Sequence, residues 1–150
     1  MDAVEAARAY LGVPFVHQGR TRRGLDCIGL VALALIDAGM GHYALHPANR
    51  TDYGRDPHEG LLERRLRDIF GEPVATAPPG QPIDLCACRP GDVAALAYAG
   101  PIRHVGLIAE HPHGLSLIHT DSHLGRVTEH RIDDRWARRV ALVFRPETSA

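Results

Sequence analysis

Cys27 is the residue of this sequence best placed to do chemistry. It follows Asp26 and begins an apolar run that continues to Ala38 and stops at Gly39. The length and apolar character of this run predict a buried helix. A thiol at a helix N-terminus lies at the positive end of the helix dipole, which favours the nucleophilic thiolate. Cys27 is therefore a candidate nucleophile, provided that the rest of the chain supplies its partners.

A catalytic cysteine needs a general base, usually a histidine, and a group that orients the imidazole. The chain has 10 histidines, so position has to select among them. His104 and His119 fall on successive predicted strands, and a hairpin centred between His111 and Pro112 places them directly opposite one another. Opposed residues of antiparallel strands share a face, with Cβ atoms about 5 Å apart. His104 and His119 are therefore the candidate partners of Cys27.

The same register sets Gly106 opposite Leu117 and Ile108 opposite Leu115, which makes the rest of that face apolar. We expect this face to pack on the helix that begins at Cys27. Each histidine taken alone is better explained as a strand residue with a local hydrogen bond. The cysteine at a helix start in the same chain favours the catalytic interpretation.

A zinc site is the alternative interpretation of a chain rich in histidine. His111 and His113, or His119 and His123, have spacings that could bind a metal, but the second spacing suits a helix, whereas this region has the pattern of strand and turn. No cysteine falls within the usual zinc-finger spacings. We expect neither a metal nor a cofactor.

Composition excludes several classes of function. The formal net charge of the 150 residues is −1, and this near-neutral charge argues against a nucleic-acid-binding protein. All 17 basic residues are arginines. Residues 1–5 lack a secretory signal pattern, and the longest apolar run, 27–36, is shorter than the about 20 residues that span a bilayer. The odd number of cysteines implies no disulfide framework, and we expect Cys86 and Cys88 to be buried or incidental thiols.

The first half of the chain predicts helices. Residues 2–5 form a capping-box pattern, and Gly12 with Pro14 ends the helix. Its apolar face comprises Val4, Ala7 and Leu11. Residues 15–26 are expected to form a loop and 40–55 an irregular segment. Asp56-Pro57-His58-Glu59 predicts a second helix start, with Leu62, Leu66 and Ile69 at helical spacing and Gly71 at the end.

The second half predicts strands. The proline-rich residues 72–91 form a surface connection and not a domain boundary, because too little chain follows for a separate core. Five strands separated by turn residues are then expected, at 92–98, 103–109, 115–120, 126–131 and 139–145. Helices followed by an antiparallel meander predict an α+β fold, with residues 1–150 as a single domain.

Five blocks of this sequence, taken in order, resemble the NlpC/P60 cysteine peptidases. They span most of the chain: Leu11-Gly12-Val13-Pro14-Phe15, Gly24-Leu25-Asp26-Cys27-Ile28-Gly29-Leu30-Val31, Arg89-Pro90-Gly91-Asp92-Val93, His104-Val105-Gly106-Leu107-Ile108 and Leu117-Ile118-His119. Two further stretches, 50–56 and 138–146, resemble the phage-type branch of the family. That branch occurs in phage tails, prophages and gene-transfer-agent clusters, where the enzyme is thought to thin the cell wall.

The resemblance implies a papain-like fold in which N-terminal helices pack on a C-terminal antiparallel β-sheet. By this resemblance Cys27 is the nucleophile, His104 the base and His119 the polar residue that orients the base. Asp121 is the next candidate if His119 points to the opposite face. The implied reaction is hydrolysis of the bond between D-glutamate and a diamino acid in peptidoglycan stem peptides.

Two positions depart from the family pattern. The family usually has tyrosine at the position of Phe15, and its hydroxyl is thought to serve the oxyanion or the cysteine, so His17 or Gln18 is the candidate substitute. The family usually has serine at the position of Ile28. In some members that serine and the preceding aspartate bind the amino end of the substrate, a role that Asp26 could keep beside that of a helix cap.

The resemblance also implies partners and a place of action. The expected partners are a peptidoglycan peptide and proteins of a phage tail or gene-transfer agent, with no nucleic acid and no membrane span. Without a signal peptide the protein is expected to be cytoplasmic when made, then particle-associated and active at the wall. Two alternatives stay open, a catalytically inactive tail or assembly component and a thiol amidase acting on another substrate.

Overall fold

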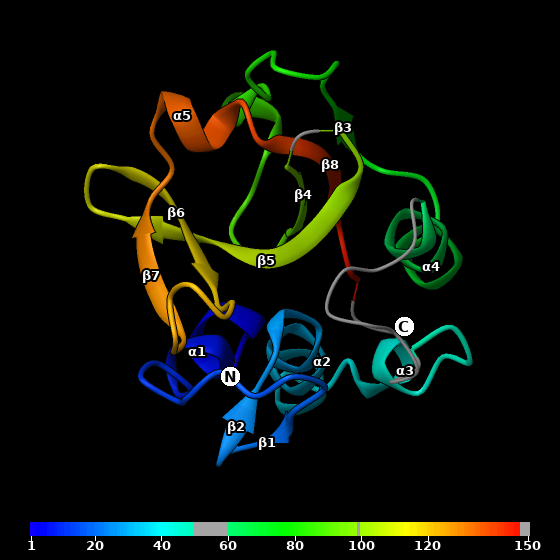
Figure 1. The fold of residues 1–150 in the computed structure, drawn as a ribbon, viewed down its shortest axis with the longest axis vertical. Coiled ribbons are helices and arrows are strands. Elements are labelled where there is room, and N and C mark those ends of the chain that lie inside the picture. Colours follow the sequence, from blue (N-terminus) through cyan, green and yellow to red (C-terminus); the bar gives the residue numbers. More distant parts are fainter. Residues whose placement is uncertain (50–59, 99, 148–150) are drawn as a thin grey trace.

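The computed structural model describes residues 1–49, 60–98 and 100–147, which form helices around an antiparallel sheet (Figure 1). The fold is therefore α+β, as the sequence predicts. The helices of the described residues are α1 (Ala3–Arg8), α2 (Cys27–Asp37), α3 (Gly41–Ala44), α4 (Leu61–Phe70), α5 (Asp134–Ala137) and the 3₁₀ turn η1 (Leu85–Ala87). None of the described helices is long and apolar enough to cross a membrane.

The main sheet has the strand order β3-β8-β4-β5-β6-β7, with every neighbouring pair antiparallel. Its strands are β3 (Ala75–Thr76), β4 (Val93–Ala97), β5 (Ile102–His111), β6 (Gly114–His119), β7 (Thr128–Arg131) and β8 (Val140–Phe144). A separate hairpin joins β1 (Arg20–Thr21) to β2 (Gly24–Leu25), in the segment predicted to be a loop.

The predicted meander is correct for β4 to β7 and wrong for the last strand. β8 does not pair with β7 but returns across the sheet to lie beside β4. The physical reason is burial. β8 is nearly all apolar and almost fully buried, whereas β7 is only partly buried along its length. A position between β3 and β4 buries an apolar strand better than a position beside the outer strand β7.

A partly buried ion pair connects the end of β8 to the start of β4. Arg145, just after β8, donates from Nε and Nη2 to the two carboxylate oxygens of Asp92 at 2.9 and 2.8 Å. Asp92 is buried and also accepts from the backbone N–H of Arg89 at 2.8 Å. A bidentate guanidinium–carboxylate pair is among the strongest polar contacts in proteins. It therefore helps to hold the end of β8 beside the start of β4.

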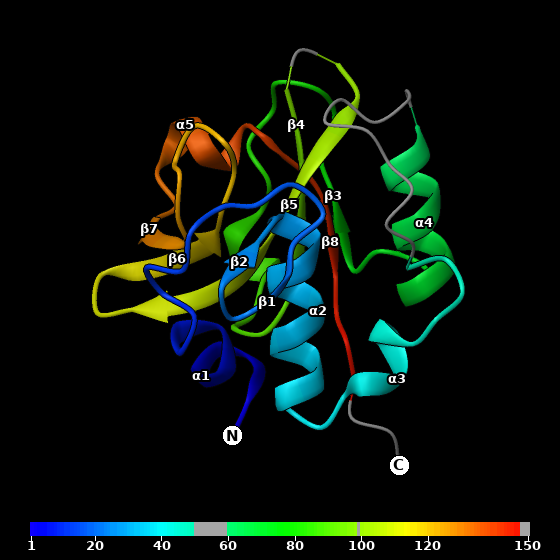
Figure 2. The same ribbon diagram turned by 60° about the horizontal axis from the view of Figure 1, so that its bottom comes forward.

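The sheet has a core on each face. On one face α1, α2 and α4 pack against residues such as Val105, Leu107 and Ile118. On the other face Ile108 and Leu117 pack with Ala137 of α5 and with the segment that contains Ile83 and Cys88. Figures 1 and 2 show α1 and α2 side by side, with α5 across β5 and β6 from them.

The predicted register of the β5–β6 hairpin is wrong by two residues. Ile108 pairs with Leu117, and His111 pairs with Gly114, so the turn is Pro112-His113. Gly114 adopts a φ of 133°, a conformation that disfavours other residues, and β6 begins there, one residue earlier than predicted. A shift of two residues keeps every side chain on its face. His104 and His119 thus still share a face, but that face packs toward α5 and not toward α2.

The N-terminal helix follows the prediction at its start and not at its end. Asp2 and Glu5 form the reciprocal capping box, and Val4 and Ala7 are buried. Leu11 is 44% exposed, contrary to the prediction, because α1 ends at Arg8 and the chain turns before reaching it.

The middle of the chain is partly predicted. The expected helix start at residues 56–59 lies outside the described residues, but α4 follows it with Leu62 and Leu66 buried as expected. The segment expected to be irregular contains the short helix α3. α5 was not expected, although Asp133 caps it by accepting from the Trp136 N–H at 3.0 Å.

Candidate active site

Cys27 is the first residue of α2, and Asp26 is its N-cap. The Asp26 carboxylate is buried and accepts from the backbone N–H of Gly29 at 2.7 Å and of Gln18 at 3.1 Å. A Cβ at Gly29 would lie 2.1 Å from the carbonyl oxygen of Gly19, so only glycine lets the preceding loop pack on the first turn of α2. These contacts hold the backbone around the cysteine in place.

The pKa of Cys27 is raised, which favours the protonated thiol at neutral pH, although the residue as a whole is partly exposed. The backbone N–H groups of Val105 and Ile28 face the sulfur and lower its pKa, as expected at a helix start. Burial outweighs them, and with the charges of Asp26 and Asp121 it raises the pKa of Cys27 to about 12. The expectation that the helix dipole favours a free thiolate is therefore not met. Removal from water costs the charged form more than the helix start contributes.

His104 on β5 and His119 on β6 are both buried and in direct contact. His104 Nε2 lies 2.7 Å from His119 Nδ1, a hydrogen-bond distance. The observed register makes the pair diagonal neighbours and not direct opposites. Because Nε2 of His104 is engaged by His119, Nδ1 is the nitrogen left for chemistry. His104 directly precedes Val105, whose N–H faces the Cys27 sulfur.

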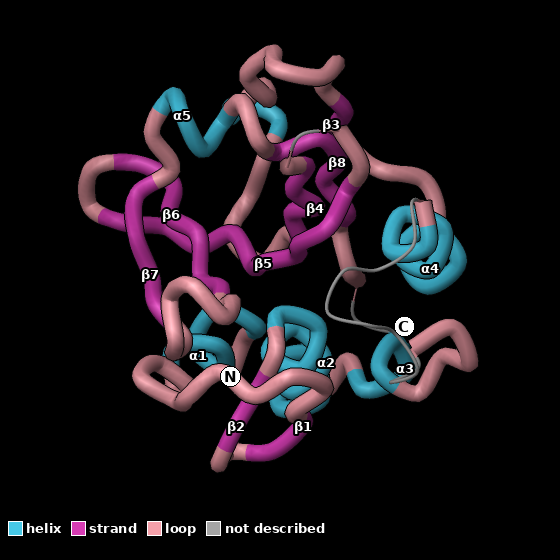
Figure 3. The backbone as a smooth tube through the Cα atoms, viewed as in Figure 1, coloured by secondary structure: helices cyan, strands magenta, loops and turns pink. Residues whose placement is uncertain are grey.

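A third histidine, His130 on β7, extends this pair and was missed by the sequence analysis. Its Nε2 lies 2.7 Å from His119 Nε2, and its Nδ1 lies 2.9 Å from the backbone oxygen of Arg131. Figure 3 shows the three strands β5, β6 and β7 that carry the histidines. The alternation of residues 126–131 could have placed His130 on a shared face, but the length of the preceding loop concealed its register.

Aromatic side chains surround this histidine row, which consists of two buried histidines and the partly exposed His130. Trp136 of α5 makes an edge contact with His119, with ring centroids 5.0 Å apart, and lies 4.5 Å from the ring of His130. The guanidinium of Arg139 lies over the rings of Trp136 and Tyr98. Tyr98 in turn is 6.0 Å from His104. The sequence pattern does not predict this group of aromatic side chains, because their arrangement depends on the unpredicted helix α5.

Burial keeps the inner histidines neutral. It lowers the pKa of His104 to about 4, although the charge of Asp121 acts in the opposite direction. Burial, together with the neighbouring rings of His104 and His130, also lowers the pKa of His119. The resting site thus contains a protonated thiol and neutral imidazoles at neutral pH.

Asp121 adds a negative charge to the site beside that of Asp26. It follows β6, and its carboxylate accepts from the backbone N–H of Leu124 at 2.7 Å. The charge raises the pKa of Cys27, His104 and Tyr98, so Asp121 acts on all three groups. It favours a protonated His104, which is the form that a base adopts during catalysis.

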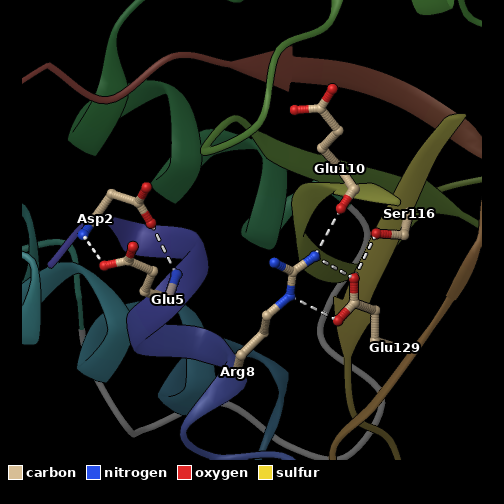
Figure 4. A network of polar contacts seen from close by, with 6 residues as sticks. All are labelled: Asp2, Glu5, Arg8, Glu110, Ser116 and Glu129. Carbon is tan, nitrogen blue, oxygen red and sulfur yellow. Dashed lines mark hydrogen bonds and ion pairs between the residues drawn. The ribbon is translucent and has the colours of Figure 1, made fainter. Parts of the chain in front are cut away.

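A network on the helical side of the sheet holds β7 in place (Figure 4). Arg8 of α1 donates to both carboxylate oxygens of Glu129 at 3.0 and 2.9 Å and to the backbone oxygen of Glu110 at 2.7 Å. Ser116 Oγ donates to the same carboxylate at 2.7 Å. Glu129 precedes His130 and faces the opposite side of β7, so this network fixes the strand that carries the outer histidine.

Comparison with known proteins decides the family. The profile of the NlpC/P60 family matches residues 12–145 of this chain. The chain belongs to the NlpC/P60 family. The match covers Cys27, Asp121 and the three histidines of the row. No curated protein sequence is similar enough to count as a relative.

Solved structures of the NlpC/P60 family share the fold. An NlpC/P60 family protein from Bacillus cereus is 18% identical, with a TM-score of 0.60, over 97% of this chain and 39% of that protein. This chain thus spans well under half of that protein. The NlpC/P60 domain of the peptidoglycan hydrolase SagA is 18% identical, with a TM-score of 0.54, over 95% of this chain and 94% of that domain.

An N-acetylmuramoyl-L-alanine amidase from Bacteroides uniformis has the same architecture. It is 13% identical, with a TM-score of 0.61, over 97% of each chain. At these identities the solved structures establish the papain-like α+β fold of the NlpC/P60 family for this chain.

The segment that departs from the NlpC/P60 pattern lies at the edge of the site. Phe15 pairs with Leu25 in an isolated bridge. His17 and Gln18 form the turn that follows and are partly buried. Gln18 has a φ of 60°, and its N–H donates to Asp26. This turn is tied to the start of α2 through its backbone.

Ile28, the second departure from the NlpC/P60 pattern, faces the helices. It lines a small apolar cavity of about 40 Å³ together with Leu35, Tyr43, Leu66 and Phe70. An isoleucine here packs among α2, α3 and α4, and it offers no hydroxyl to a substrate.

The remaining cysteines lie away from the site. Cys86 is exposed and Cys88 is buried, and all three cysteines of the chain are free thiols. Cys88 belongs to the core on the α5 side. Among the described residues, no group of three or more histidine, cysteine or acidic side chains is arranged to hold a metal ion.

Proposed function

We propose that this protein is a cysteine endopeptidase that hydrolyses the stem peptides of peptidoglycan. One arrangement carries the proposal. His104, in hydrogen-bond contact with His119, directly precedes the residue whose N–H faces the Cys27 sulfur. Thiol, imidazole and orienting group are the components of nucleophilic catalysis by cysteine.

In the proposed mechanism His104 accepts the Cys27 proton on Nδ1 as the sulfur attacks the amide carbon. The amide C–N bond then breaks, and the proton on His104 goes to the departing amine. Water, deprotonated by the same nitrogen, hydrolyses the thioester and restores the thiol. Because burial raises the pKa of Cys27 and lowers that of His104, proton transfer accompanies the attack and does not precede it.

The site has groups that can stabilise the oxyanion and the His104 imidazolium that form during the proposed reaction. The backbone N–H of Cys27, at the first position of α2, has no acceptor among the described residues and is the proposed oxyanion donor. The charge of Asp121 favours the His104 imidazolium. His17 and Gln18, in the adjoining turn, stay the proposed source of a second donor, and Asp26 the proposed contact for the substrate's amino end.

The bond between D-glutamate and a diamino acid is the proposed point of cleavage. The family membership of the chain supports it. Proteins of the same fold carry the names peptidoglycan hydrolase and N-acetylmuramoyl-L-alanine amidase, so the fold alone does not select the bond. The chemical structure of the fragments released from the wall identifies the bond that is cleaved.

Digestion of purified peptidoglycan tests the proposal. The wild-type protein should release fragments with a new amino end on the diamino acid, and Cys27→Ala should release none. Cys86→Ala, which removes an exposed thiol outside the site, should digest like the wild type. Release of whole stem peptides would instead assign an amidase. Absence of cleavage on several wall types would favour an inactive assembly component.

Association with a phage tail or gene-transfer agent is a further part of the proposal. It is supported by the resemblance of residues 50–56 and 138–146 to the phage-type branch. The first stretch lies outside the described residues, and the second contains β8 and the Arg145 clamp on Asp92. Mass spectrometry of particles purified from the source cells should detect the protein if the association holds. Its absence from washed particles would contradict it.

A further inference from the structure

His130 is the one member of the histidine row to which the mechanism above gives no task. His104, His119 and His130 lie on three neighbouring strands, each two residues away from direct register with the next. Both spacings between ring nitrogens are 2.7 Å. The row ends at the backbone oxygen of Arg131, 2.9 Å from His130 Nδ1.

The backbone oxygen at the end of the row decides where the protons lie. A carbonyl oxygen only accepts, so His130 must carry its proton on Nδ1 and present a bare Nε2. His119 then has to donate from Nε2, which leaves its Nδ1 bare. His104 in turn donates from Nε2 to His119, and its own Nδ1 carries no proton.

Counting protons gives the same result. Three neutral imidazoles share three N–H protons. The Arg131 oxygen takes one, and each of the two contacts between rings takes one. None is left for the Nδ1 of His104, which is the nitrogen that must accept the proton of Cys27.

We infer that His130 is a positioning residue which, anchored on the Arg131 carbonyl, holds His104 in the tautomer that can act as a base. The inference rests on the proposed function of His104. His130 acts through His119 and does not touch the substrate. His119 alone would not suffice, because without an outer partner its ring can donate or accept toward His104 equally well.

The surroundings of the row support this role. The lowered pKa values of His104 and His119 mean that the inner rings are neutral, as the proton count requires. Trp136 contacts the rings of both His119 and His130 and restricts their rotation. Glu129, held by Arg8 and Ser116, fixes the backbone beside His130.

The proton count also predicts a response to acid. One extra proton in the row occupies His104 Nδ1, whichever ring carries the charge, and the base is lost. The charged and titratable groups around the row are Asp121, Tyr98 and Cys27 at His104, and Asp133 and Arg139 near His130 and Trp136. Activity should therefore fall once acid adds a proton to the row.

Nitrogen NMR of histidine-labelled protein tests the tautomers without any substrate. In the wild type, His104 should show a bare Nδ1 and a protonated Nε2. His130→Gln should keep this pattern, because its amide can donate to the Arg131 oxygen and accept from His119. His130→Ala should show His104 as a mixture of both tautomers. A single unchanged tautomer in His130→Ala would overturn the inference.

Kinetics supply the second readout. His130→Ala should lower kcat on the order of tenfold with little change in KM, less than the about 10²–10⁴-fold that a general base contributes, because His119 remains. His130→Gln should restore kcat. His113→Ala, an exposed histidine at the β5–β6 turn, is the matched control and should change neither. Equal kcat in wild type and His130→Ala would contradict the inference.

The proposed function and the role of His130 can be tested independently of each other. The rate at which iodoacetamide alkylates Cys27 reports the thiol and its base in the absence of any wall substrate. If the wild type cleaves no peptidoglycan but the tautomers and alkylation rates respond to His130 as expected, the substrate is wrong and the inference stands. If cleavage occurs and neither readout responds to His130→Ala, the inference is wrong and the proposed function stands.

Discussion

Gly106 on β5 faces His119 on β6 so closely that a Cβ atom at residue 106 would lie 3.0 Å from the Cβ of His119. The same atom would lie 2.8 Å from Leu117 Cδ1 and 3.1 Å from the backbone oxygen of Ile118. The missing side chain is what lets the His119 ring lean across the strand pair to reach His104.

Gly106→Ala should therefore separate the two histidines. We expect a loss of about 1–3 kcal/mol in the free energy of unfolding, as for overpacked sites. We also expect kcat to fall in the fraction of the protein that stays folded. Urea denaturation and peptidoglycan hydrolysis measure the two effects. Gly41→Ala is the control, because its added Cβ meets only ordinary contacts, at 3.8 Å from Ile36. Full activity of Gly106→Ala would show that the contact between His119 and His104 does not depend on the missing side chain at residue 106.

Stability should fall in mild acid. The pKa of His104 is about 4 in the folded protein and about 6.5 in an unfolded chain, so the unfolded state binds more protons between these values. Stability is present above pH about 6.5 and is lost as pH falls toward 4, by about 3 kcal/mol for this residue. The lowered pKa of His119 acts in the same direction.

Urea denaturation at a series of pH values checks this. His104→Gln should flatten the decline between pH about 6.5 and 4, whereas His113→Gln, at an exposed position, should leave it unchanged. A wild-type free energy of unfolding that stays constant down to pH about 4.5 would rule out buried neutral histidines.

Asp121→Asn should affect thiol reactivity and catalysis in opposite directions. The carboxylate raises the pKa of Cys27 and of His104, so its removal lowers both. Alkylation of Cys27 at fixed alkaline pH should become faster, because more thiolate is present. Hydrolysis should become slower, on the order of tenfold, because the His104 imidazolium loses its counter-charge.

The asparagine keeps the acceptor for the Leu124 N–H, so the turn after β6 should be retained. Iodoacetamide kinetics and hydrolysis rates provide the two measurements. Asp68→Asn, on the exposed side of α4, should alter neither rate. A parallel rise or a parallel fall of both rates would refute the charge effect.

Arg8→Ala should loosen β7 from α1. The change removes two contacts to Glu129 and one to the Glu110 oxygen, and it leaves a carboxylate that is only 12% exposed without its cation. Hydrogen bonds to charged groups contribute about 1.5–3 kcal/mol, so we expect a loss in that range.

Denaturant unfolding of Arg8→Ala measures the loss. Arg138→Ala, which breaks the exposed pair with Asp134, is the matched control and should cost about 0–1 kcal/mol. Equal effects of the two variants would mean that the Arg8 network is an ordinary surface contact.

Local patterns were enough to predict the main elements. The apolar run after Asp26 predicts α2 because an acidic cap and a long apolar stretch suffice to define a buried helix. The strands β4 to β7 all begin and end within two residues of their predicted bounds, because turn residues separate them. Face assignment also survives a register error, so the sequence predicts that His104 and His119 share a face.

Features that depend on long-range packing were not predictable. β8 lies beside β4 because that position buries it, and no local signal encodes the choice. Leu11 is exposed because α1 ends early. His130 was missed because the loop before β7 hides the register that aligns it with His119.

By itself the sequence determined the candidate nucleophile, the two inner histidines and the family resemblance, because each depends on residue types at short spacing. Only the tertiary structure decided the protonation of the site, since the pKa of Cys27 reflects burial more than its place at a helix start. It also decided which nitrogen of His104 is left for the thiol. That choice depends on three strands brought side by side and on one backbone oxygen at the end of their histidine row.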